Sequence, residues 1–380
     1  MRILIATPDF PLWDGGIATV AFEVAQSLTR LGHHVVVMAP QQDEKDLVFD
    51  ATLPFTVCRV RNIKSRLLRL YYHRYALIRL VSRYRIDLVM AQTWFPCGTA
   101  ALLALRKRGV PFTLTVHGNE ILNPKFAAPG WQKLMAAVFS SADRIYCVSR
   151  CTADKALAML PDLPRLAEKI TVIYNGVDPS QFIPAPEDPD LISRYGLEGK
   201  KVILTLARLV ERKGQDMLIK ALPLIKESCP DVKYVICGKG PYEAKLRELA
   251  IEQGVVDDVV FAGFVSNEDR VKFYNLCDIY AMPSREIVEH GDVEGFGITY
   301  LEANACAKAV IGGKSGGVSD AIVDGVTGVL VDPAAPTEIA AAAVRLLSDP
   351  LYATRLGEQG RCRVVEEFSW DGICRSMVEN

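Results

Sequence analysis

The chain has 380 residues and is 50% hydrophobic, so it is long enough to bury two separate cores. Its net charge of −1 hides two unlike halves, because residues 1–180 carry 22 Lys and Arg against 14 Asp and Glu, whereas the remainder carries 22 against 31. Ten scattered cysteines without paired spacing argue against a disulfide framework or a zinc site, and no apolar run reaches the length of a membrane span.

Short apolar segments alternate with helical patterns along the first half of the chain. Residues 3–7, 35–39, 87–92, 112–116 and 144–148 are apolar enough to be strands buried on both faces. Residues 17–31, which Gly32 closes, and residues 98–107 carry apolar side chains at helical spacing instead. This alternation predicts an α/β, doubly wound, Rossmann-like domain on a mainly parallel sheet.

One segment of this half, from Arg59 to Arg85, is strongly basic and contains no acidic residue. Its apolar residues fall near one helical face, which predicts an amphipathic helix. Such a helix suits an anionic membrane surface, and Arg66 and Arg69 are candidates for the acceptor side of a site. The alternative is a helix that packs on the core and turns a solvated basic face outward.

A second series of strands and helices begins after a passage rich in proline and aspartate. We predict a linker over residues 181–199, between an N-terminal domain of residues 1–180 and a C-terminal domain of residues 200–367. The expected strands are 202–207, 233–237, 259–262, 279–282 and 309–312, and a helix over 368–380 is expected to pack back on the first domain. Two such domains would face a central cleft at the carboxyl ends of their strands.

The stretch from Glu294 to Glu302 places two carboxylates around a glycine-rich turn that opens a helix. Unpaired N–H groups at a helix start suit a phosphate, and a carboxylate beside them suits the hydroxyls of a sugar or ribose. The residues that offer these N–H groups are Phe296, Gly297, Ile298 and Thr299. The stretch therefore predicts a sugar-nucleotide site, and the alternative is an acidic loop before an ordinary helix.

Polar residues follow several other predicted strands. Arg208 and Lys213 come after the first strand of the second domain, where two cations can neutralise a diphosphate. His117 follows the strand over 112–116, with Asn119 and Glu120 beside it as acceptor-side candidates. Polar side chains at the carboxyl end of a parallel strand face the ligand crevice, so these residues are candidates for the site.

Glycine-rich turns complete the set of candidate binding residues. Gly15 and Gly16 follow the first strand without the spaced glycines of a dinucleotide fingerprint, which weakens an oxidoreductase interpretation. Gly238 lies in a turn that can approach a nucleotide closely, and Phe264 and Val265 can bracket a base. No spacing of acids, histidines or cysteines predicts a metal site.

With these residues in place, the chain resembles the family 4 glycosyltransferases of the GT-B fold over nearly its whole length. The most specific element is the E-x7-E pattern of Glu294 and Glu302. Supporting motifs occur in the same order as in the family: Gly15-Gly16, His117-Gly118, Arg208 with Lys213-Gly214, and Gly316-Gly317.

The resemblance implies a role for each matching residue. His117 would lie against the transferred sugar and Glu294 would bind its hydroxyls, which makes these two the catalytic candidates. Glu302 would bind the ribose diol, and Arg208 and Lys213 would hold the diphosphate. The resemblance also implies that the sugar is transferred with retention of its anomeric configuration and without a metal or other cofactor. The implied route is a front-face reaction in which the leaving phosphate accepts the proton of the acceptor.

We therefore predict a retaining, metal-independent hexosyltransferase of the cytoplasm, with a peripheral place at the inner membrane face left open. The acidic loop over 285–293 is similar to that of phosphatidylinositol mannosyltransferase-like enzymes. GDP-mannose-type and UDP-glucose-type donors both remain open, with family frequency slightly favouring UDP. The expected partners are a nucleotide sugar and a lipid-linked or cell-envelope glycan, with no nucleic acid. The alternatives are a GT-B-type sugar-nucleotide epimerase and a catalytically silent binding protein.

Overall fold

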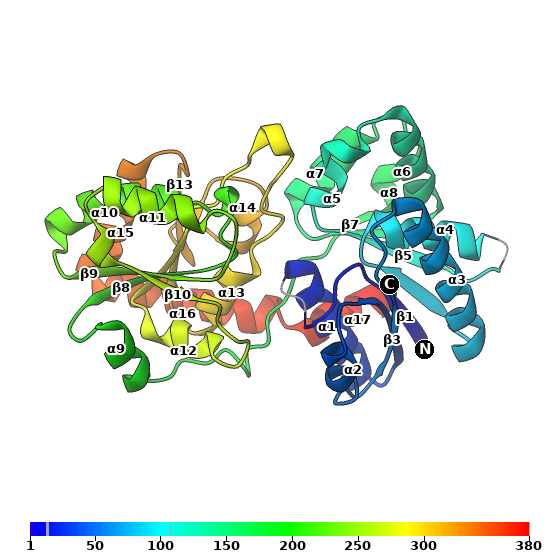
Figure 1. The fold of residues 1–380 in the computed structure, drawn as a ribbon, viewed down its shortest axis with the longest axis horizontal. Helices are drawn as coiled ribbons and strands as arrows, with labels where there is room; N and C mark the ends of the chain where they lie inside the picture. The colour runs from blue at the N-terminus through cyan, green and yellow to red at the C-terminus, as the bar shows by residue number, and fades with distance from the viewer. Residues whose placement is uncertain (13–14, 107, 380) are drawn as a thin grey trace. The chain divides into compact units, whose positions relative to one another are not determined.

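The computed structural model describes residues 1–12, 15–106 and 108–379. The chain forms two units, Met1–Asn175 with the C-terminal segment from Trp370, and Gly176–Ser369 (Figure 1). Each unit contains one parallel sheet with helices packed against it. The stretch 181–199, predicted as a linker, belongs to the second unit and contains a helix, α9 (Pro189–Tyr195), whose N-cap is Asp188.

The sheet of the first unit has the strand order β3-β2-β1-β4-β5-β6-β7, and its neighbouring strands pair in parallel. The order turns back at β1 and β4, so the connections leave these two neighbours in opposite directions. The strands are β1 (Arg2–Ala6), β2 (His34–Gln41), β3 (Thr56–Arg61), β4 (Leu88–Ala91), β5 (Phe112–Val116), β6 (Arg144–Cys147) and β7 (Ile170–Val172).

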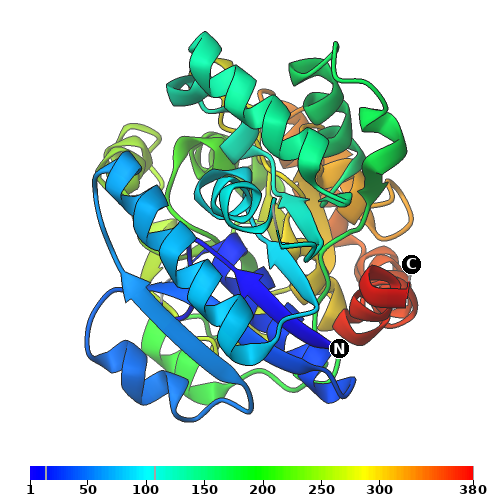
Figure 2. The ribbon, with the colours of Figure 1, turned by 90° about the vertical axis from the view of Figure 1, so that its right-hand side faces the viewer.

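The core of this unit lies on both faces of the sheet, because its central strands have apolar side chains at nearly every position. Leu4, Val36, Val89 and Leu114 are fully buried and belong to the cluster that α3, α4 and α6 cover. Figure 2 shows α3 running along the sheet. The helices are α1 (Gly16–Arg30), α2 (Lys45–Asp50), α3 (Arg66–Tyr84), η1 (Trp94–Gly98), α4 (Thr99–Leu105), α5 (Asn119–Leu122), η2 (Pro124–Phe126), α6 (Pro129–Ser141), α7 (Arg150–Met159) and α8 (Leu166–Lys169).

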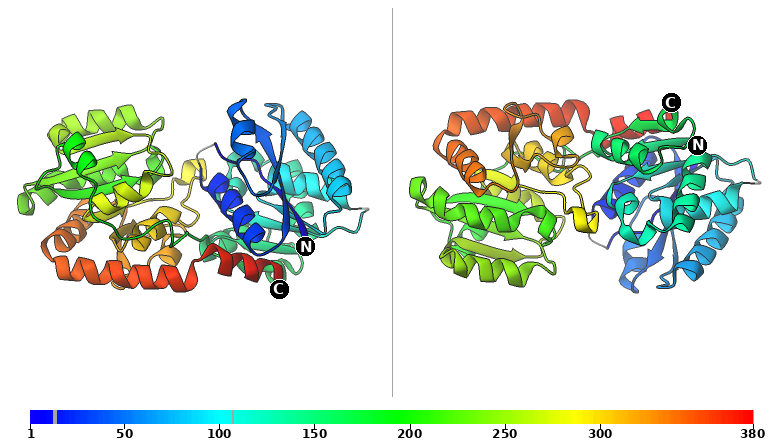
Figure 3. Two further views of the ribbon diagram at one scale, coloured as in Figure 1. Left: turned by 90° about the horizontal axis from the view of Figure 1, so that it is seen from below. Right: turned by 90° about the horizontal axis from the view of Figure 1, so that it is seen from above.

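The C-terminal helix α17 (Trp370–Glu379) packs against α1 within the first unit, as Figure 3 shows. Its Asp371 accepts hydrogen bonds from Ser27 and Arg30 of α1, each at 2.7 Å. The Tyr146 hydroxyl at β6 donates to the Met377 carbonyl at 2.9 Å. The chain thus returns from the second unit to complete the first one.

The basic amphipathic helix predicted within the segment from Arg59 to Arg85 is present as α3 (Arg66–Tyr84), but the first arginines of the segment do not belong to it. Arg59 lies in the edge strand β3; its side chain is only 3% exposed, and its charge is compensated by Asp50 at 2.8 Å. The helix α3 begins at Arg66 and turns His73, Leu77 and Leu80 toward the core. The segment was misread because a buried arginine cannot be told from a solvated one by composition alone.

The second unit repeats the plan with the strand order β10-β9-β8-β11-β12-β13 and a turning point between β8 and β11. Its strands are β8 (Lys201–Leu206), β9 (Val232–Cys237), β10 (Val259–Gly263), β11 (Ile279–Met282), β12 (Ala309–Gly313) and β13 (Gly328–Val331). The predicted strands of both halves are confirmed, and β3, β7 and β13 are additional. The remaining helices are η3 (Glu211–Lys213), α10 (Gln215–Ser228), α11 (Glu243–Glu252), η4 (Val256–Asp258), α12 (Arg270–Leu276), η5 (Val288–His290), α13 (Ile298–Ala305), α14 (Val318–Ala321), α15 (Pro336–Ser348) and α16 (Pro350–Glu367).

Candidate functional site

The loop after β8 carries the cations of the second unit to its topological switch point, where open α/β sheets bind ligands. Arg208 is exposed, whereas Lys213 is buried at the end of η3. Gly214 follows with φ +75°, and a Cβ there would lie 2.1 Å from the Pro283 carbonyl oxygen. Only glycine allows this close approach, which brings Lys213 beside the loop that leaves β11.

Lys213 contacts Glu294, the first carboxylate of the E-x7-E pattern, with 2.6 Å between Nζ and Oε2. Arg212 binds the same carboxylate oxygen and also reaches Asp292, at 2.8 Å. Burial disfavours the charged carboxylate, but Lys213 and Arg212 outweigh it and lower the pKa of Glu294 to about 2. Burial also lowers the pKa of the Lys213 ammonium, against the opposing effect of Glu294. The site therefore holds an ionised carboxylate between two cations.

The glycine-rich turn after Glu294 ends at the first turn of α13. Gly297 is the N-cap with φ +93°, and a Cβ there would lie 2.5 Å from the Tyr300 ring. Phe296 is buried, whereas Ile298 and Thr299 are half-buried in the first helical turn. A helix start in this setting offers backbone N–H groups and the positive end of the helix dipole to an anion.

Glu302, the second carboxylate, lies on α13 and is only 2% exposed. Its Oε2 accepts a hydrogen bond from the Tyr274 hydroxyl at 2.5 Å and is ion-paired with Arg270. Both partners belong to α12, so the acid ties two helices of the second unit together. Burial raises the pKa of Tyr274 well above its ordinary value, so this hydroxyl stays protonated and donates.

The predicted base-binding residues follow β9 and β10, which are neighbours in the second sheet. Gly238 has φ +134°, and its N–H donates to the Gly263 carbonyl at 2.6 Å. Phe264 comes directly after this contact and is 53% exposed, with the Lys239 ammonium 5.9 Å from its ring centroid. Val265 is half-buried beside it. The two loops thus present an exposed aromatic ring next to close-packed backbone.

The turn after β1 in the first unit carries Gly15 and Gly16, of which Gly16 begins α1. Trp13 and Asp14, which precede them, lie outside the described residues. Gly15 and Gly16 have no atom within 4 Å of the place where a Cβ would stand. They are therefore not required by packing within the described chain, in contrast to Gly214 and Gly297.

His117 lies one residue beyond β5, with its backbone held by Glu120. The Glu120 carboxylate accepts from the His117 N–H at 2.6 Å, and this carboxylate together with Gly118 (φ +117°) fixes the turn into α5. Burial raises the pKa of Glu120 to about 7, against the effect of backbone hydrogen bonds. Because backbone groups occupy its carboxylate, Glu120 acts as a support for His117, while Asn119 begins the helix α5.

The imidazole of His117 is held in one orientation by the backbone carbonyl of Gln92, to which a ring nitrogen donates. Its Nε2 is covered and has no partner among the described residues, so Nδ1 is the nitrogen that binds Gln92. Burial lowers the pKa of His117 to about 4. The ring is therefore neutral near pH 7, and Nε2 offers a lone pair that can accept a hydrogen bond from a hydroxyl.

The two predicted acceptor-side arginines lie in the first turn of α3 and make local contacts. The Arg66 guanidinium lies 5.5 Å from the ring centroid of Phe126 and 5.6 Å from that of Trp131. Arg69 Nε donates to the Ile63 carbonyl at 2.7 Å. Both side chains are half-buried, so each helps to fix the start of α3.

Several residues that complete this geometry were missed by the sequence analysis. Arg212 and Arg270 neutralise the two carboxylates of the pattern, and Arg285 binds Asp216 through two bonds of 2.8 and 2.9 Å. The Arg285 N–H also donates to the Arg212 carbonyl at 2.8 Å, which fastens the cation-bearing loop. A second arginine directly before Lys213 was the one signal in the sequence.

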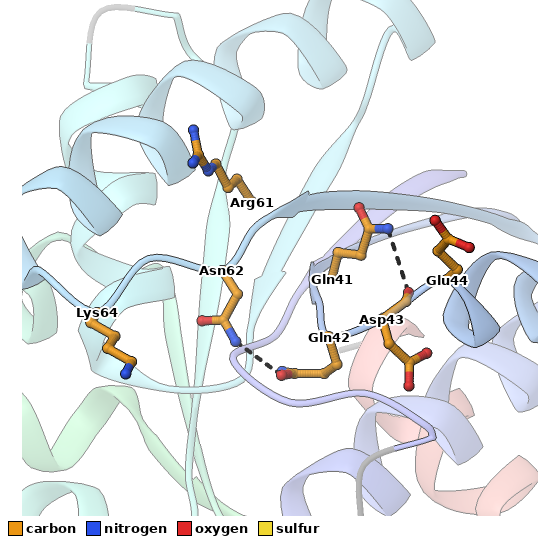
Figure 4. Close-up of a pocket in the computed structure, with 7 residues that line it drawn as sticks. All are labelled: Gln41, Gln42, Asp43, Glu44, Arg61, Asn62 and Lys64. Atoms are coloured by element: carbon orange, nitrogen blue, oxygen red, sulfur yellow. Dashed lines mark hydrogen bonds between the residues drawn. The ribbon is translucent and has the colours of Figure 1, made fainter.

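A shallow pocket of about 680 Å³ lies at the carboxyl ends of β2 and β3, apart from the residues described above. Figure 4 shows the side chains of Gln42 and Asn62 turned toward each other, and they share a hydrogen bond of 3.0 Å. Its charged residues are exposed, so the pocket lacks the buried charges of the Glu294 region. Within residues 1–12, 15–106 and 108–379, no three His, Cys, Asp or Glu side chains gather as a metal-binding group.

Comparison with known proteins places both units in one class. The family model of glycosyl transferases group 1 matches residues 189–363, and that of Glycosyltransferase Family 4 matches residues 14–181. The GDP-mannose-dependent alpha-(1-6)-phosphatidylinositol monomannoside mannosyltransferase of Mycolicibacterium smegmatis is 33% identical, covering 97% of this chain and 95% of the relative. A Corynebacterium glutamicum enzyme, the GDP-mannose-dependent monoacylated alpha-(1-6)-phosphatidylinositol monomannoside mannosyltransferase, is 31% identical with the same coverage.

Solved structures show the same architecture at lower sequence identity. HepE of Anabaena, crystallised with UDP and glucose, has a TM-score of 0.82 at 22% identity and covers 100% of this chain and 98% of that one. The trehalose-6-phosphate synthase OtsA has a TM-score of 0.72 at 15% identity, with 100% and 98% covered. These likenesses show the GT-B fold. The family models and the full-length relatives establish that this chain belongs to the family 4 glycosyltransferases.

Proposed function

We propose that this chain transfers mannose from GDP-mannose to a mannosylated lipid of the phosphatidylinositol class, with retention of configuration and without a metal ion. The choice of GDP-mannose over a UDP-sugar is supported by the full-length relatives, which are GDP-mannose-dependent mannosyltransferases, and it replaces the slight preference for UDP drawn from the sequence. The observation that carries the proposal is the ionised Glu294 held between Lys213 and Arg212 beside the start of α13.

The charges of this cluster suit a nucleoside diphosphate as leaving group. Negative charge grows on the phosphate oxygen as the glycosidic bond breaks, and preorganised cations and N–H groups stabilise it. Lys213 and Arg208, together with the first turn of α13, supply these groups in the second unit. Because Arg212 also binds Glu294, the carboxylate keeps a counter-charge when Lys213 turns toward a phosphate.

The same cluster argues for a hydroxyl-binding role of Glu294. A carboxylate with a pKa of about 2, pinned by two cations, is a weak base and a poor nucleophile. The proposed step is therefore a front-face exchange. The bond from the anomeric carbon to phosphate breaks, the bond to the acceptor oxygen forms on the same face, and the acceptor proton moves to a phosphate oxygen of the departing GDP.

Lys213, Arg208 and the helix start would supply the positive charge that a divalent cation gives in other transferases. Undiminished turnover in the presence of a strong chelator would support metal independence. A dependence on added magnesium or manganese would contradict it. Product analysis by NMR tests retention, since the new linkage is expected to keep the α configuration of the donor.

The lipid part of the proposal rests on the outer face of α3. Leu67, Tyr71 and Tyr75 recur at four-residue spacing and are 77%, 60% and 51% exposed. Exposed arginines, Arg74 and Arg79, flank this row. Aromatic and basic residues on one helical face suit an anionic bilayer surface, where a peripheral enzyme reaches its lipid acceptor. None of the helices within the described residues is both long and apolar enough to cross a membrane.

The proposal is tested first by the melting temperature of the protein in a panel of GDP-mannose, UDP-glucose and ADP-glucose. A ligand that binds only the native state raises the melting temperature, and we expect GDP-mannose to give the largest shift. A larger shift with UDP-glucose would overturn the donor assignment.

Incubation of GDP-mannose without acceptor separates transfer from epimerisation, because only an epimerase converts the donor alone. If Glu294→Ala leaves wild-type turnover unchanged, the assigned site is wrong. If the wild type has no turnover, a silent binding protein remains.

A further inference from the structure

Gln92 is a buried polar side chain that the site described above does not use. It follows the last residue of β4 and is only 1% exposed. Both atoms of its carboxamide, Oε1 and Nε2, are covered and have no hydrogen-bond partner among the described residues. A buried amide left unpaired disfavours the folded state, so such a residue calls for a reason other than stability.

The register of the sheet places this carboxamide beside other unpaired groups. Met90 is aligned with Thr113 and Ala91 with Leu114, so Gln92 comes next to Thr115 on the neighbouring strand. Side chains alternate between the faces of a strand, and Leu114 and Val116 belong to the core cluster on one face. Gln92, Thr115 and His117 therefore share the opposite face. Thr115 Oγ1 and His117 Nε2 also lack partners within the described chain.

The position of these groups in the fold is that of a ligand site. β4 adjoins β1 where the strand order of the first sheet turns back, and ligands of doubly wound sheets bind at this point beyond the carboxyl ends of the strands. The backbone carbonyl of Gln92, as distinct from its unpaired carboxamide, also fixes the ring of His117, so the two residues form one structural unit. The glycines Gly15 and Gly16 lie in the turn after β1, the other strand of the switch point.

The chemistry of the three groups defines the ligand class. A carboxamide donates through Nε2 and accepts through Oε1, a threonine hydroxyl does both, and the free His117 nitrogen accepts. None of them carries a charge when His117 is neutral, so they do not suit a phosphate. Neighbouring hydroxyls of a pyranose or cyclitol ring offer the complementary donors and acceptors.

We propose that Gln92, with Thr115, forms a hydroxyl-binding subsite next to His117 that reads adjacent hydroxyl groups of a sugar or cyclitol ring. This inference deepens the proposed transferase function and rests on it for the identity of the ring. The ring belongs either to the transferred mannose or to the acceptor, because both carry adjacent hydroxyl groups that can donate and accept hydrogen bonds. Gln92 is thus a specificity-determining residue, whose carboxamide forms hydrogen bonds only when substrate is bound.

The test compares Gln92→Met with the wild type on two series of deoxy substrates, GDP-mannoses and acceptors that each lack one ring hydroxyl. We expect the wild type to lose 10-fold or more in kcat/KM on at least one analogue, and Gln92→Met to lose most of that discrimination. If Gln92→Met changes the loss in kcat/KM that a missing hydroxyl causes in the donor series, the ring is that of mannose. If it changes this loss in the acceptor series, the ring is that of the acceptor. If both proteins lose the same kcat/KM on every analogue of both series, the proposal is overturned.

Stability provides a second readout. Removal of an unpaired amide is expected to raise the melting temperature of the ligand-free Gln92→Met protein while its kcat/KM falls. A lower melting temperature with unchanged discrimination would show a purely structural amide and overturn the proposal. Thr115→Val is the second subsite variant. Thr113→Val, two residues deeper in β5 with a likewise unpaired hydroxyl, is the matched control that is expected to keep wild-type kinetics.

A final arm separates this inference from the proposed function. If the wild type transfers nothing from GDP-mannose, free mannose and myo-inositol are titrated into wild type, Gln92→Met and Thr113→Val while the chemical shifts of the ligand are followed. Binding that Gln92→Met alone abolishes would sustain the subsite without the transferase. No binding by the wild type in this arm would overturn the subsite as well.

Discussion

A substitution of Lys213 can separate its role in binding the leaving group from its contribution to the stability of the fold. Its replacement by Met removes one cation from Glu294, but Arg212 still neutralises the carboxylate, so we expect a small change in melting temperature. If Lys213 stabilises the departing phosphate, kcat is expected to fall by about 10²–10³. Lys200→Met, which removes an exposed pair with Asp231, is the matched control and should keep wild-type turnover. Equal turnover of both variants would remove Lys213 from the site.

Glu302 is expected to couple stability to nucleotide binding. Glu302→Ala leaves Arg270 buried without its partner, which typically costs about 3–5 kcal/mol in the free energy of unfolding. We expect that loss in urea denaturation, together with a higher KM for the donor if the carboxylate binds the ribose. Glu243→Ala, which breaks an exposed pair with Arg247, should change stability by less than about 1 kcal/mol. A stable Glu302→Ala protein would contradict the structure of the α12–α13 contact.

Glu120 predicts an unusual dependence of stability on pH. Its pKa is about 7 in the folded chain against 4.5 for the free side chain. Between these values the folded state keeps a proton that the unfolded state has released, so the free energy of unfolding falls as pH rises from about 5 to 7. The loss is about 3 kcal/mol, and most of it has occurred by pH 7, where half of the folded molecules have released the proton. Glu120→Gln cannot titrate, so its urea unfolding curve should lack this decline.

The comparison of Glu120→Gln with the wild type isolates one group, because every other titration is common to both proteins. The substituted side chain keeps an oxygen that can accept the His117 N–H. A parallel decline of both proteins between pH 5 and 7 would show that Glu120 is already ionised in the folded state.

At the scale of single elements, the central strands were predictable and the edges were not. β1, β4 and β5 are apolar runs buried on both faces, and each appears where the pattern placed it. β3 is an edge strand in which Arg59 and Arg61 interrupt the apolar pattern, so its arginines were assigned to a helix. β7 has only three residues, which are too few for a strand pattern of hydrophobic residues to be detected. Burial of Arg59 depends on Asp50 and on the Pro11 carbonyl, which no local rule reveals.

The residues of the candidate site also fall into those that the sequence could predict and those that it could not. Lys213, Glu294 and Glu302 could be found because the motif spacing marks them. The partners Arg212, Arg270 and Tyr274 could not, since they meet the carboxylates only through tertiary packing of separate loops and helices. Gln92 was passed over for a related reason, because a lone glutamine after a strand has no sequence pattern until the register aligns it with Thr115.

The outer face of α3 makes a prediction about membranes. Tyr71→Ser with Tyr75→Ser removes aromatic surface that the fold leaves exposed, so the folded protein should keep its melting temperature. We expect its partition onto vesicles of anionic phospholipid to fall about tenfold or more, from the loss of apolar burial in the interface. Reversal of Arg74 and Arg79 to Glu should weaken binding by about 1 kcal/mol per charge removed, and this effect should shrink at high salt.

The control for this experiment is Leu351→Ser, at an 85% exposed residue of α16 in the second unit. It is expected to bind vesicles like the wild type. Equal binding by the Tyr71 and Tyr75 variant would show that α3 is a solvated helix, the alternative that the sequence left open. Arg66 and Arg69 are better avoided here, because their contacts with Phe126, Trp131 and Ile63 support the helix start.

At the scale of the whole molecule, the two units should respond differently to the nucleotide. All four tryptophans of the chain, at positions 13, 94, 131 and 370, belong to the first unit, so their fluorescence reports on that unit alone. The proposed nucleotide-binding residues, including Lys213, Gly238 and Glu302, lie in the second unit. Circular dichroism follows the helices of both units. The pair of signals can therefore distinguish which unit a ligand stabilises.

We expect GDP at about 100 times its Kd to stabilise the second unit by about 2.7 kcal/mol. The transition seen by circular dichroism but not by fluorescence should move to higher urea, while the fluorescence transition stays in place. Lys213→Met should bind GDP more weakly and reduce the shift at the same GDP concentration. A shift confined to the fluorescence transition would place the nucleotide in the first unit and contradict the assignment. If both transitions move together in the wild type and neither moves in Lys213→Met, the units unfold as one cooperative body and Lys213 still binds the diphosphate.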